Sequence, residues 1–134
     1  MEAISVIIPV YNRRDKIIRA ISSVLNQTYP VDEIIVVYDG SADGTYELVA
    51  NRFAGDSRIK CYRMQENRGA AATRNYGVKM ASNELIAFQD SDDIWLDDKI
   101  EKQMGLFSNP ETVIVYSPYY VQQKMLILMK QSIL

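Results

Sequence analysis

The amino-acid sequence predicts an α/β fold, with a mostly parallel open sheet and helices on both of its faces. Apolar runs of strand length alternate along the chain with segments whose apolar residues recur at helical spacing, which is typical of βαβ units. The run at residues 33–38 (EIIVVY) is almost continuously apolar, as expected for a strand that is covered on both faces. With 134 residues, of which 48% are hydrophobic and 24% charged, the chain has the composition of one soluble globular domain.

The first two elements are a strand and a helix. Residues 4–9 (ISVIIP) are rich in β-branched side chains, which favour a strand, and the run ends at a proline. Residues 14–26 predict a helix, because Ile17, Ile21 and Val24 recur at a spacing that places them on one face. A proline-containing segment then separates this helix from the next strand.

The middle of the chain repeats the alternation. After the strand at residues 33–38, a loop with two glycines leads into a short predicted helix at residues 45–53. Asp43 or Thr45 can cap this helix, since short polar side chains satisfy the free N–H groups of a first turn. Residues 59–64 (IKCYRM) predict a weaker strand, because polar residues interrupt the apolar run.

The last elements are two helices and two strands. Residues 70–80 contain helix formers and small residues, with Gly77 as an interruption, and residues 85–89 form an apolar run of strand length. Residues 97–107 predict a helix that opens with two aspartates, where the helix dipole favours negative charge. Residues 112–116 (TVIVY) predict a last short strand.

Residues 119–134 form an apolar C-terminal tail. Its most apolar part, residues 125–129 (MLILM), lies between two lysines and is too short to span a bilayer. The sequence leaves open whether the tail is a docking helix, an oligomer contact or a loosely ordered end.

The composition excludes several classes of function. The net charge of −2 argues against a general nucleic-acid binder, so we expect no nucleic-acid partner. The chain has no histidine, which excludes Ser-His-Asp and Cys-His catalysis and argues against a zinc site. Cys61 is the single cysteine, so a reducing compartment fits. The N-terminal residues do not resemble a signal peptide and no run is long enough for a transmembrane segment, so we expect a cytoplasmic location.

An acidic cluster follows the predicted strand at residues 85–89. It consists of Asp90, Asp92 and Asp93, with Ser91 between the first two and no basic residue among them. Carboxylates this close repel each other and should not all be ionised in a dry site. Mg²⁺ or Mn²⁺ would relieve the repulsion, and such a hard cation often keeps positions open for a phosphate. A solvated acidic turn that caps the next helix is the alternative, and the spacing alone leaves both open.

Polar residues also stand near the ends of other predicted elements. Asp39 and Gly40 come directly after the second strand, and Arg74 lies on the helix that leads to the strand before the acidic cluster. Because ligands of open α/β sheets bind at the carboxyl ends of the strands, we expect these residues to share one rim. Asp39 can accept a hydrogen bond from a base or a ribose, and Arg74 can pair with a phosphate. Each residue alone is also common in plain turns or on surfaces, but the set suits a nucleotide-like ligand.

Two other motifs fit the acidic cluster less well. Residues 90–101 imitate a calcium-binding loop, but Trp95 stands where the sharp turn needs glycine, which rejects that interpretation. An Asp-x-Asp after a strand also occurs in haloacid-dehalogenase-type phosphatases, in which Asp90 would be the nucleophile. In those enzymes the motif normally follows the first strand of the domain, whereas here it follows a late strand.

Five segments together resemble the N-terminal part of a family 2 glycosyltransferase with the GT-A fold. They are VIIPVYN, SVLNQTY, EIIVVYDGSADGT, NRGAAATRNYG and AFQDSDDIW, which begin at residues 6, 23, 33, 67 and 87. Their order and spacing make the resemblance specific over residues 4–117. It implies a Rossmann-like, nucleotide-sugar-binding subdomain at residues 1–118, followed by the tail at residues 119–134, for which we see no counterpart in the family.

The resemblance implies a glycosyltransferase that uses a nucleotide-sugar donor, usually a UDP-sugar, together with Mg²⁺ or Mn²⁺. Members of the family generally invert the anomeric centre as they transfer the sugar to a saccharide or lipid-linked acceptor, often at the inner membrane face. At matching positions, Pro9 and Tyr11 would line the base pocket. Asp39 would meet the uracil or ribose, and Arg74 would approach the nucleotide.

The D-x-D motif of the family corresponds to Asp90, Ser91 and Asp92. The resemblance implies that Asp90 and Ser91 contact the nucleotide. It also implies that Asp90, Asp92 and Asp93 hold the metal.

Two departures from the family pattern qualify these expectations. Tyr38 replaces the first residue of an aspartate pair that commonly precedes the glycine. The catalytic base of the family lies well beyond the equivalent of Tyr116, and residues 119–134 contain no Asp or Glu, so no catalytic residue is evident. Two alternatives therefore stay open. One is a catalytically incomplete nucleotide-sugar or metal-binding fragment that acts through self-association, as in a homodimer. The other is an aspartate-based phosphatase.

Overall fold

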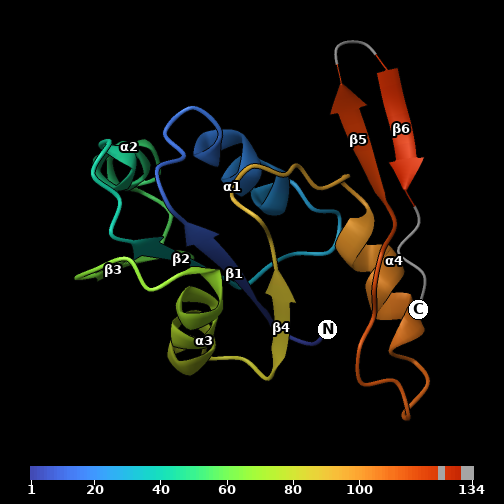
Figure 1. Ribbon diagram of the computed structural model, residues 1–134. Coiled ribbons are helices and arrows are strands. Elements are labelled where there is room, and N and C mark those ends of the chain that lie inside the picture. The colour runs from blue at the N-terminus through green and yellow to red at the C-terminus, as the bar shows by residue number, and fades with distance from the viewer. Residues whose placement is uncertain (124–125, 131–134) are drawn as a thin grey trace.

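The computed structural model describes residues 1–123 and 126–130. Its main body is a four-stranded parallel sheet in the order β3-β2-β1-β4 (Figure 1). The helices and strands of this body are β1 (Ile4–Val10), α1 (Ile17–Leu25), β2 (Glu33–Asp39), α2 (Thr45–Arg52), β3 (Ile59–Met64), α3 (Ala70–Met80), β4 (Leu85–Phe88) and α4 (Lys99–Leu106). The predicted α/β class with a parallel open sheet is confirmed.

The two inner strands carry the most apolar sequences. β1 pairs with β2 on one side, in a register that places Val6 opposite Ile34, and with β4 on the other. All seven residues of β2 are buried, as its continuous apolar run predicts for a strand between two neighbours and two covered faces.

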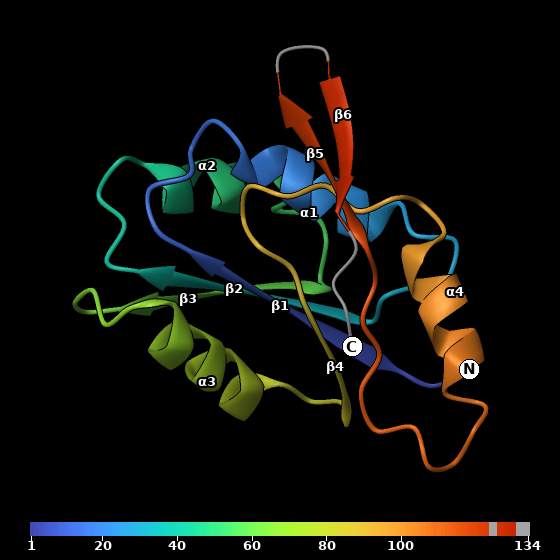
Figure 2. The same ribbon diagram turned by 45° about the vertical axis from the view of Figure 1, so that its right-hand side comes forward.

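Helices cover both faces of the sheet, as the two views in Figures 1 and 2 show. α1 and α2 lie on one face, where Ile21 of α1 and Val49 of α2 join Val36 in the larger apolar core. α3 lies on the opposite face, where Tyr76 packs against a smaller core around Ile7. Alternate residues of β1 and β2 therefore supply the two cores, as the pleat of a strand requires.

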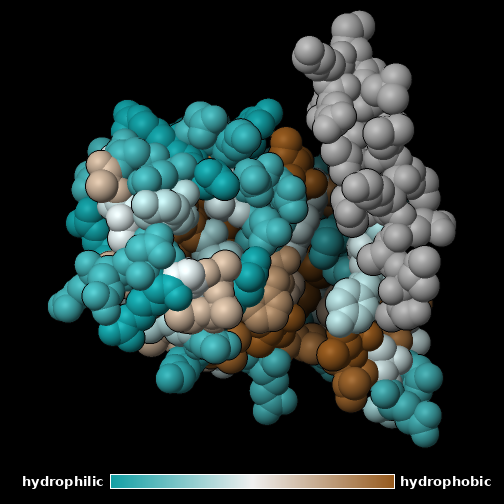
Figure 3. Space-filling model, viewed as in Figure 1, coloured by the Kyte–Doolittle hydropathy of each residue, from teal (hydrophilic) through white to brown (hydrophobic). Residues whose placement is uncertain are grey.

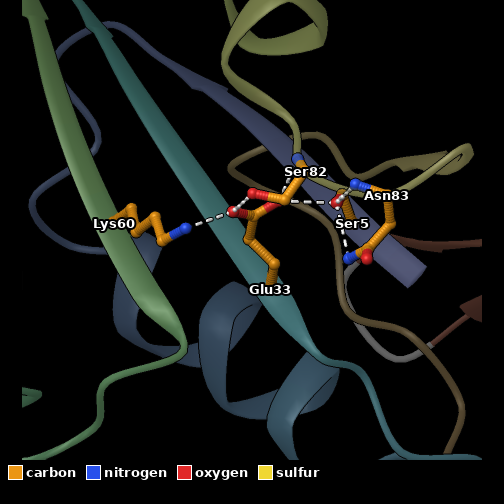
Figure 4. A network of polar contacts seen from close by, with 5 residues as sticks. All are labelled: Ser5, Glu33, Lys60, Ser82 and Asn83. Atoms are coloured by element: carbon orange, nitrogen blue, oxygen red, sulfur yellow. Dashed lines mark hydrogen bonds and ion pairs between the residues drawn. The ribbon is translucent and has the colours of Figure 1, made fainter. Parts of the chain in front are cut away.

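A polar network ties the amino ends of the strands together (Figure 4). The Glu33 carboxylate, at the start of β2 and buried, accepts hydrogen bonds from the hydroxyls of Ser5 and Ser82 at 2.6 and 2.9 Å. The ammonium group of Lys60 donates to it at 2.5 Å, and Asn83 donates to the Ser5 hydroxyl at 3.0 Å. This network lies at the end of the sheet opposite to the carboxyl ends of the strands.

The predicted strand at residues 112–116 is wrong, because the chain there is irregular. In the part of the chain that the structure describes, this segment forms no ladder with β4, which stays at the edge of the sheet. Val113, Ile114 and Tyr116 are 83%, 63% and 61% exposed, so the apolar sequence has no core to enter. Figure 3 shows hydrophobic surface gathered on the β4 side of this view, whereas hydrophilic surface covers α2 and β3.

The described part of the tail contains two antiparallel strands, β5 (Tyr119–Gln123) and β6 (Leu126–Lys130). A docking helix, one of the three alternatives for the tail, is therefore wrong for these ten positions, and the last four residues lie outside the described ones. Among the described helices, none has the length and apolar character needed to cross a membrane.

Candidate nucleotide-binding site

An open pocket of about 250 Å³ lies at the carboxyl ends of the strands. Segments that follow β1, β2 and β4 meet the first turns of α3 there, as the topology of an open α/β sheet predicts. Its lining contains most of the site residues expected from the sequence, together with one charged residue that was not expected, Arg13. The lining residues are Pro9, Val10, Tyr11, Arg13, Asp39, Ala70, Thr73, Arg74, Asp90, Ser91 and Asp92.

Asp39 has a structural role that the sequence did not reveal. The residue is 4% exposed, and its two carboxylate oxygens accept hydrogen bonds from the backbone N–H groups of Arg68 and Gly69 at 2.7 and 2.8 Å. Gly40 beside it has a φ of +74°, and a Cβ there would lie 3.0 Å from the backbone nitrogen of Asn67. The end of β2 and the turn before α3 are therefore held in close contact.

The loop after β1 is fastened to the loop after β2 by Asn12. Its φ of +48° is in the left-handed region, which asparagine tolerates better than most residues. Its backbone N–H donates to the Ser41 hydroxyl at 3.1 Å, and its side-chain oxygen accepts from the N–H of Ala42 at 3.0 Å. These bonds fix the direction of the chain between Tyr11 and Arg13, which both line the pocket. The sequence predicts a turn at Tyr11–Asn12, since an asparagine directly after a strand end is a turn signal, but not the bonds of Asn12 to Ser41 and Ala42.

Two guanidinium groups face the acidic cluster. Nη2 of Arg74 donates to Oδ1 of Asp90 at 2.7 Å, and Nε of Arg13 lies 4.0 Å from Oδ2 of Asp92. The second pair is half exposed, with side-chain exposures of 44% and 42%, so its contribution to stability is small. The sequence predicts a positive charge near these carboxylates. The two arginine side chains supply part of this charge.

Asp93 is the one predicted site residue that does not line the pocket. Its N–H donates to the carbonyl of Asp90 at 3.1 Å, and its own carbonyl accepts from the buried side-chain amide of Gln89 at 2.7 Å. Partial burial raises the pKa of its carboxyl group, and the charges of Asp90 and Asp92 raise it further. The backbone of Asp93 therefore shapes the turn that presents the other two carboxylates.

The chain after the acidic cluster is anchored to α1. The N–H of Trp95 donates to the Ser23 hydroxyl at 3.0 Å, and the Gln27 amide donates to the carbonyl of Leu96 at 2.7 Å. Gln27 also accepts from the N–H of Ile100 at 2.9 Å. Trp95 is 7% exposed and belongs to the larger core, so the acidic loop stands on a packed base.

Tyr38, which stands in place of an expected aspartate, lies in the core and not in the pocket. It is 1% exposed, its hydroxyl lies 3.7 Å from Sγ of Cys61, and its ring packs edge-on against that of Tyr46. The tyrosine hydroxyl therefore does not replace the missing carboxylate at the site.

The carboxylate oxygens of the pocket fit a divalent cation whose remaining ligands come from a bound phosphate. No group of three or more Asp, Glu, Cys or His side chains within residues 1–123 and 126–130 is arranged to hold a metal. Asp90 and Asp92, however, present exposed carboxylates to one pocket. Mg²⁺ is usually bound by one or two carboxylates together with substrate phosphates, which matches this pair and not an all-protein cage.

The chain is an open parallel α/β domain whose acidic and basic side chains gather at the carboxyl edge of the sheet, where ligands of such folds bind. The family model described as glycosyl transferase family 2 matches residues 5–133, and the chain belongs to this family.

Curated relatives point to the same family. The chain is 39% identical over 127 residues to the E. coli protein named UDP-Glc:alpha-D-GlcNAc-diphosphoundecaprenol beta-1,3-glucosyltransferase WfaP, covering 95% of this chain and 50% of the relative. It is 40% identical over 116 residues to the putative teichuronic acid biosynthesis glycosyltransferase TuaG of Bacillus subtilis, covering 87% and 46%. The chain thus spans about half the length of these relatives.

Solved structures share the fold and belong to the GT-A class. The mannosyltransferase PcManGT from Pyrobaculum calidifontis, in complex with GDP-Man and Mn²⁺, matches with a TM-score of 0.73 and 28% identity, covering 80% of this chain and 32% of that one. S. aureus TarS 1–349, in complex with UDP-GlcNAc, matches with a TM-score of 0.69 and 30% identity, covering 82% and 32%.

Proposed function

We propose that this chain is the donor-binding part of an inverting glycosyltransferase. It binds a nucleotide sugar, with UDP as the preferred nucleotide, together with Mg²⁺ or Mn²⁺, for transfer of the sugar to an acceptor hydroxyl. The observation that carries the proposal is the pocket at the carboxyl edge of the sheet, where Asp39, Arg74, Asp90 and Asp92 gather from separate segments. The nucleotide donors bound by TarS and PcManGT support it, since both proteins share this fold.

Five side chains of the pocket would contact the nucleotide in this proposal. Pro9 and the half-exposed Tyr11 offer an apolar surface for the base at the end of β1. Ser91 and Asp90 face the ribose and the phosphates, where Asp90 can exchange its bond to Arg74 for a ligand group. The guanidinium of Arg74 then pairs with a phosphate, whose charge and shape it matches.

The carboxylates complete the donor site. Asp92 and Asp90 are the proposed cation ligands, with Asp93 supporting their turn through its backbone. A divalent cation held by these two carboxylates would supply positive charge for the diphosphate leaving group. We assign no catalytic base to the described residues, so the group that deprotonates the acceptor stays unassigned.

The acceptor that we propose is a saccharide linked to a lipid diphosphate. The name of WfaP specifies such an acceptor, and that protein shares 39% identity with this chain. Ile94 and Leu96, on the chain directly after the acidic cluster, are 57% and 62% exposed and offer an apolar surface near the pocket. We therefore also propose a peripheral location at the inner membrane face, where such acceptors are reached.

Calorimetric titration with UDP, in the presence and absence of Mn²⁺, tests the donor site. We expect UDP binding that depends on Mn²⁺, is lost in Asp92→Ala, and is kept in Asp97→Ala. Asp97 is an exposed carboxylate on the same loop that does not line the pocket, which makes it a matched control. Failure of the wild-type chain to bind UDP with Mn²⁺ present would overturn the proposal. GDP and dTDP in the same assay test the choice of base.

The open edge of β4 and the exposed side chains of residues 113–116 favour one alternative function, a binding fragment that self-associates. Sedimentation velocity over a range of concentrations distinguishes the two. A concentration-dependent dimer without donor hydrolysis supports the alternative, whereas a monomer that hydrolyses or transfers the sugar contradicts it.

A further inference from the structure

We propose that Arg13 is a second phosphate-binding residue of the donor site, which exchanges Asp92 for the nucleotide diphosphate when cation and nucleotide bind. This inference rests on the proposed function. Arg13 lines the same pocket as Arg74, and its Nε lies 4.0 Å from Oδ2 of Asp92, the carboxylate proposed as a cation ligand.

The backbone of Arg13 is held on both sides. Asn12 before it is bonded to Ser41 and to the next residue of the β2–α2 loop. The carbonyl of Arg13 accepts hydrogen bonds from the N–H groups of Lys16 and Ile17 at 3.0 and 2.9 Å, where α1 begins. The base of the side chain is therefore fixed at the pocket rim, whereas its 44% exposure leaves the guanidinium room to change rotamer.

The balance of charge in the pocket favours the exchange of Asp92 for the diphosphate as the partner of Arg13. If Asp92 binds a divalent cation, its carboxylate has less negative charge left to attract the guanidinium of Arg13. The cation would also repel this guanidinium. The diphosphate brings new negative charge into the same pocket. Arginine matches phosphate oxygens with two parallel N–H groups, so the diphosphate is the better partner for Arg13 once Asp92 binds the cation.

This exchange predicts effects of opposite sign for Arg13→Gln. Without the competing ion pair between Arg13 and Asp92, Mn²⁺ alone should bind up to about five-fold more tightly. This fold-change corresponds to the interaction energy of an exposed ion pair. UDP in saturating Mn²⁺ should bind about ten-fold more weakly, because a charged hydrogen bond to the phosphate is lost. A residue with a purely structural role would weaken both.

The experiment compares the wild-type chain with Arg13→Gln, Arg13→Lys and Arg19→Gln. Arg19 lies on the exposed side of α1 outside the pocket lining, so its variant controls for the loss of one positive charge. Electron paramagnetic resonance of free Mn²⁺ measures cation binding, and calorimetry measures binding of UDP and UMP with Mn²⁺ present. We expect Arg13→Gln to weaken UDP more than UMP, Arg13→Lys to lie between it and the wild type, and Arg19→Gln to change neither.

Three outcomes separate this inference from the donor-site proposal. If the wild type binds no UDP, both are overturned. If the wild type and Arg13→Gln bind UDP equally, the donor site stands and the role of Arg13 is refuted. If Arg13→Gln weakens Mn²⁺ and UDP alike, Arg13 supports the fold of the rim and does not exchange partners.

Discussion

Replacement of Glu33 by glutamine tests the polar network at the amino ends of the strands. Four donor groups converge on this carboxylate, which is 3% exposed: the hydroxyls of Ser5 and Ser82, the N–H of Ser82 and the ammonium of Lys60. Glutamine keeps the shape but has one oxygen and one NH₂ group. On either side, the NH₂ group would face one donor that cannot accept, the ammonium of Lys60 or the N–H of Ser82, in a buried position.

The lost hydrogen bonds and the lowered pKa of Glu33 indicate the same size of effect. An unsatisfied buried group, together with the loss of charged hydrogen bonds, costs about 2–4 kcal/mol. Burial alone would raise the pKa of Glu33, but hydrogen bonds from Lys60, Ser5 and Ser82 lower it from 4.5 to about 2. This lowering corresponds to about 3 kcal/mol of stability at neutral pH. We therefore expect Glu33→Gln to lower the free energy of unfolding by about 3 kcal/mol at pH 7.

The pH dependence has a defined sign. Because the pKa of Glu33 is lower in the folded chain, its contribution is complete above pH 4.5 and is lost as the pH falls toward 2. Urea unfolding followed by circular dichroism should thus show a wild-type advantage at pH 7 that shrinks below pH 4.5. Glu66→Gln is the control, because Glu66 and Arg68 form an ion pair that is 69% and 62% exposed, and it should change stability by less than about 0.5 kcal/mol. A Glu33→Gln variant that matches this control at pH 7 would refute the reasoning.

Three further variants test the packing, a buried charge and the pocket rim. Gly77→Ala should destabilise the chain by about 1–3 kcal/mol in urea unfolding, because the new Cβ would lie 2.5 Å from Cγ2 of Ile7. This cost should exceed the gain from the better helix propensity of alanine. Increased stability would contradict this packing. Burial lowers the pKa of Lys99 from 10.5 to about 8, so the unfolded chain holds more protons between these values and stability should rise there with pH. Lys99→Met should remove that rise in unfolding curves recorded at pH 7 and 9.5. Asp39→Asn should lower the free energy of unfolding by about 1–3 kcal/mol, because one backbone N–H at the start of α3 loses its acceptor. Hydrogen exchange of that amide should accelerate. Unchanged exchange would contradict the role of Asp39.

The arrangement of the sheet was predictable because apolar runs on inner strands leave a strong pattern. The bounds of β3 and α3 match those expected from the sequence, and those of β1, β2 and β4 differ by one residue. The predicted starts of α1 and α4 were less accurate, because tertiary contacts decide them. α4 begins at Lys99 and not at Asp97, whose carbonyl accepts a hydrogen bond from Thr28 of the loop after α1.

The site was predictable as a set of segments but not as a set of contacts. The carboxyl ends of parallel strands must meet at one edge, which placed Asp39 and Asp90 together. The ion pair of Arg13 with Asp92 joins residues far apart in the sequence, and no local sequence pattern predicts it. The strand expected at residues 112–116 failed for a related reason, since an apolar run becomes a strand only when a neighbouring strand pairs with it.

The bonds between Asp39 and the start of α3 constrain any redesign of the proposed donor site. A substitution at position 39 aimed at another base would also release the turn that begins α3, the helix on which Arg74 is mounted. The carboxylate that the family resemblance places at the base or ribose thus also holds the helix that carries Arg74. Redesign toward a different nucleotide would have better prospects at Pro9 and Tyr11, which line the pocket at the end of β1.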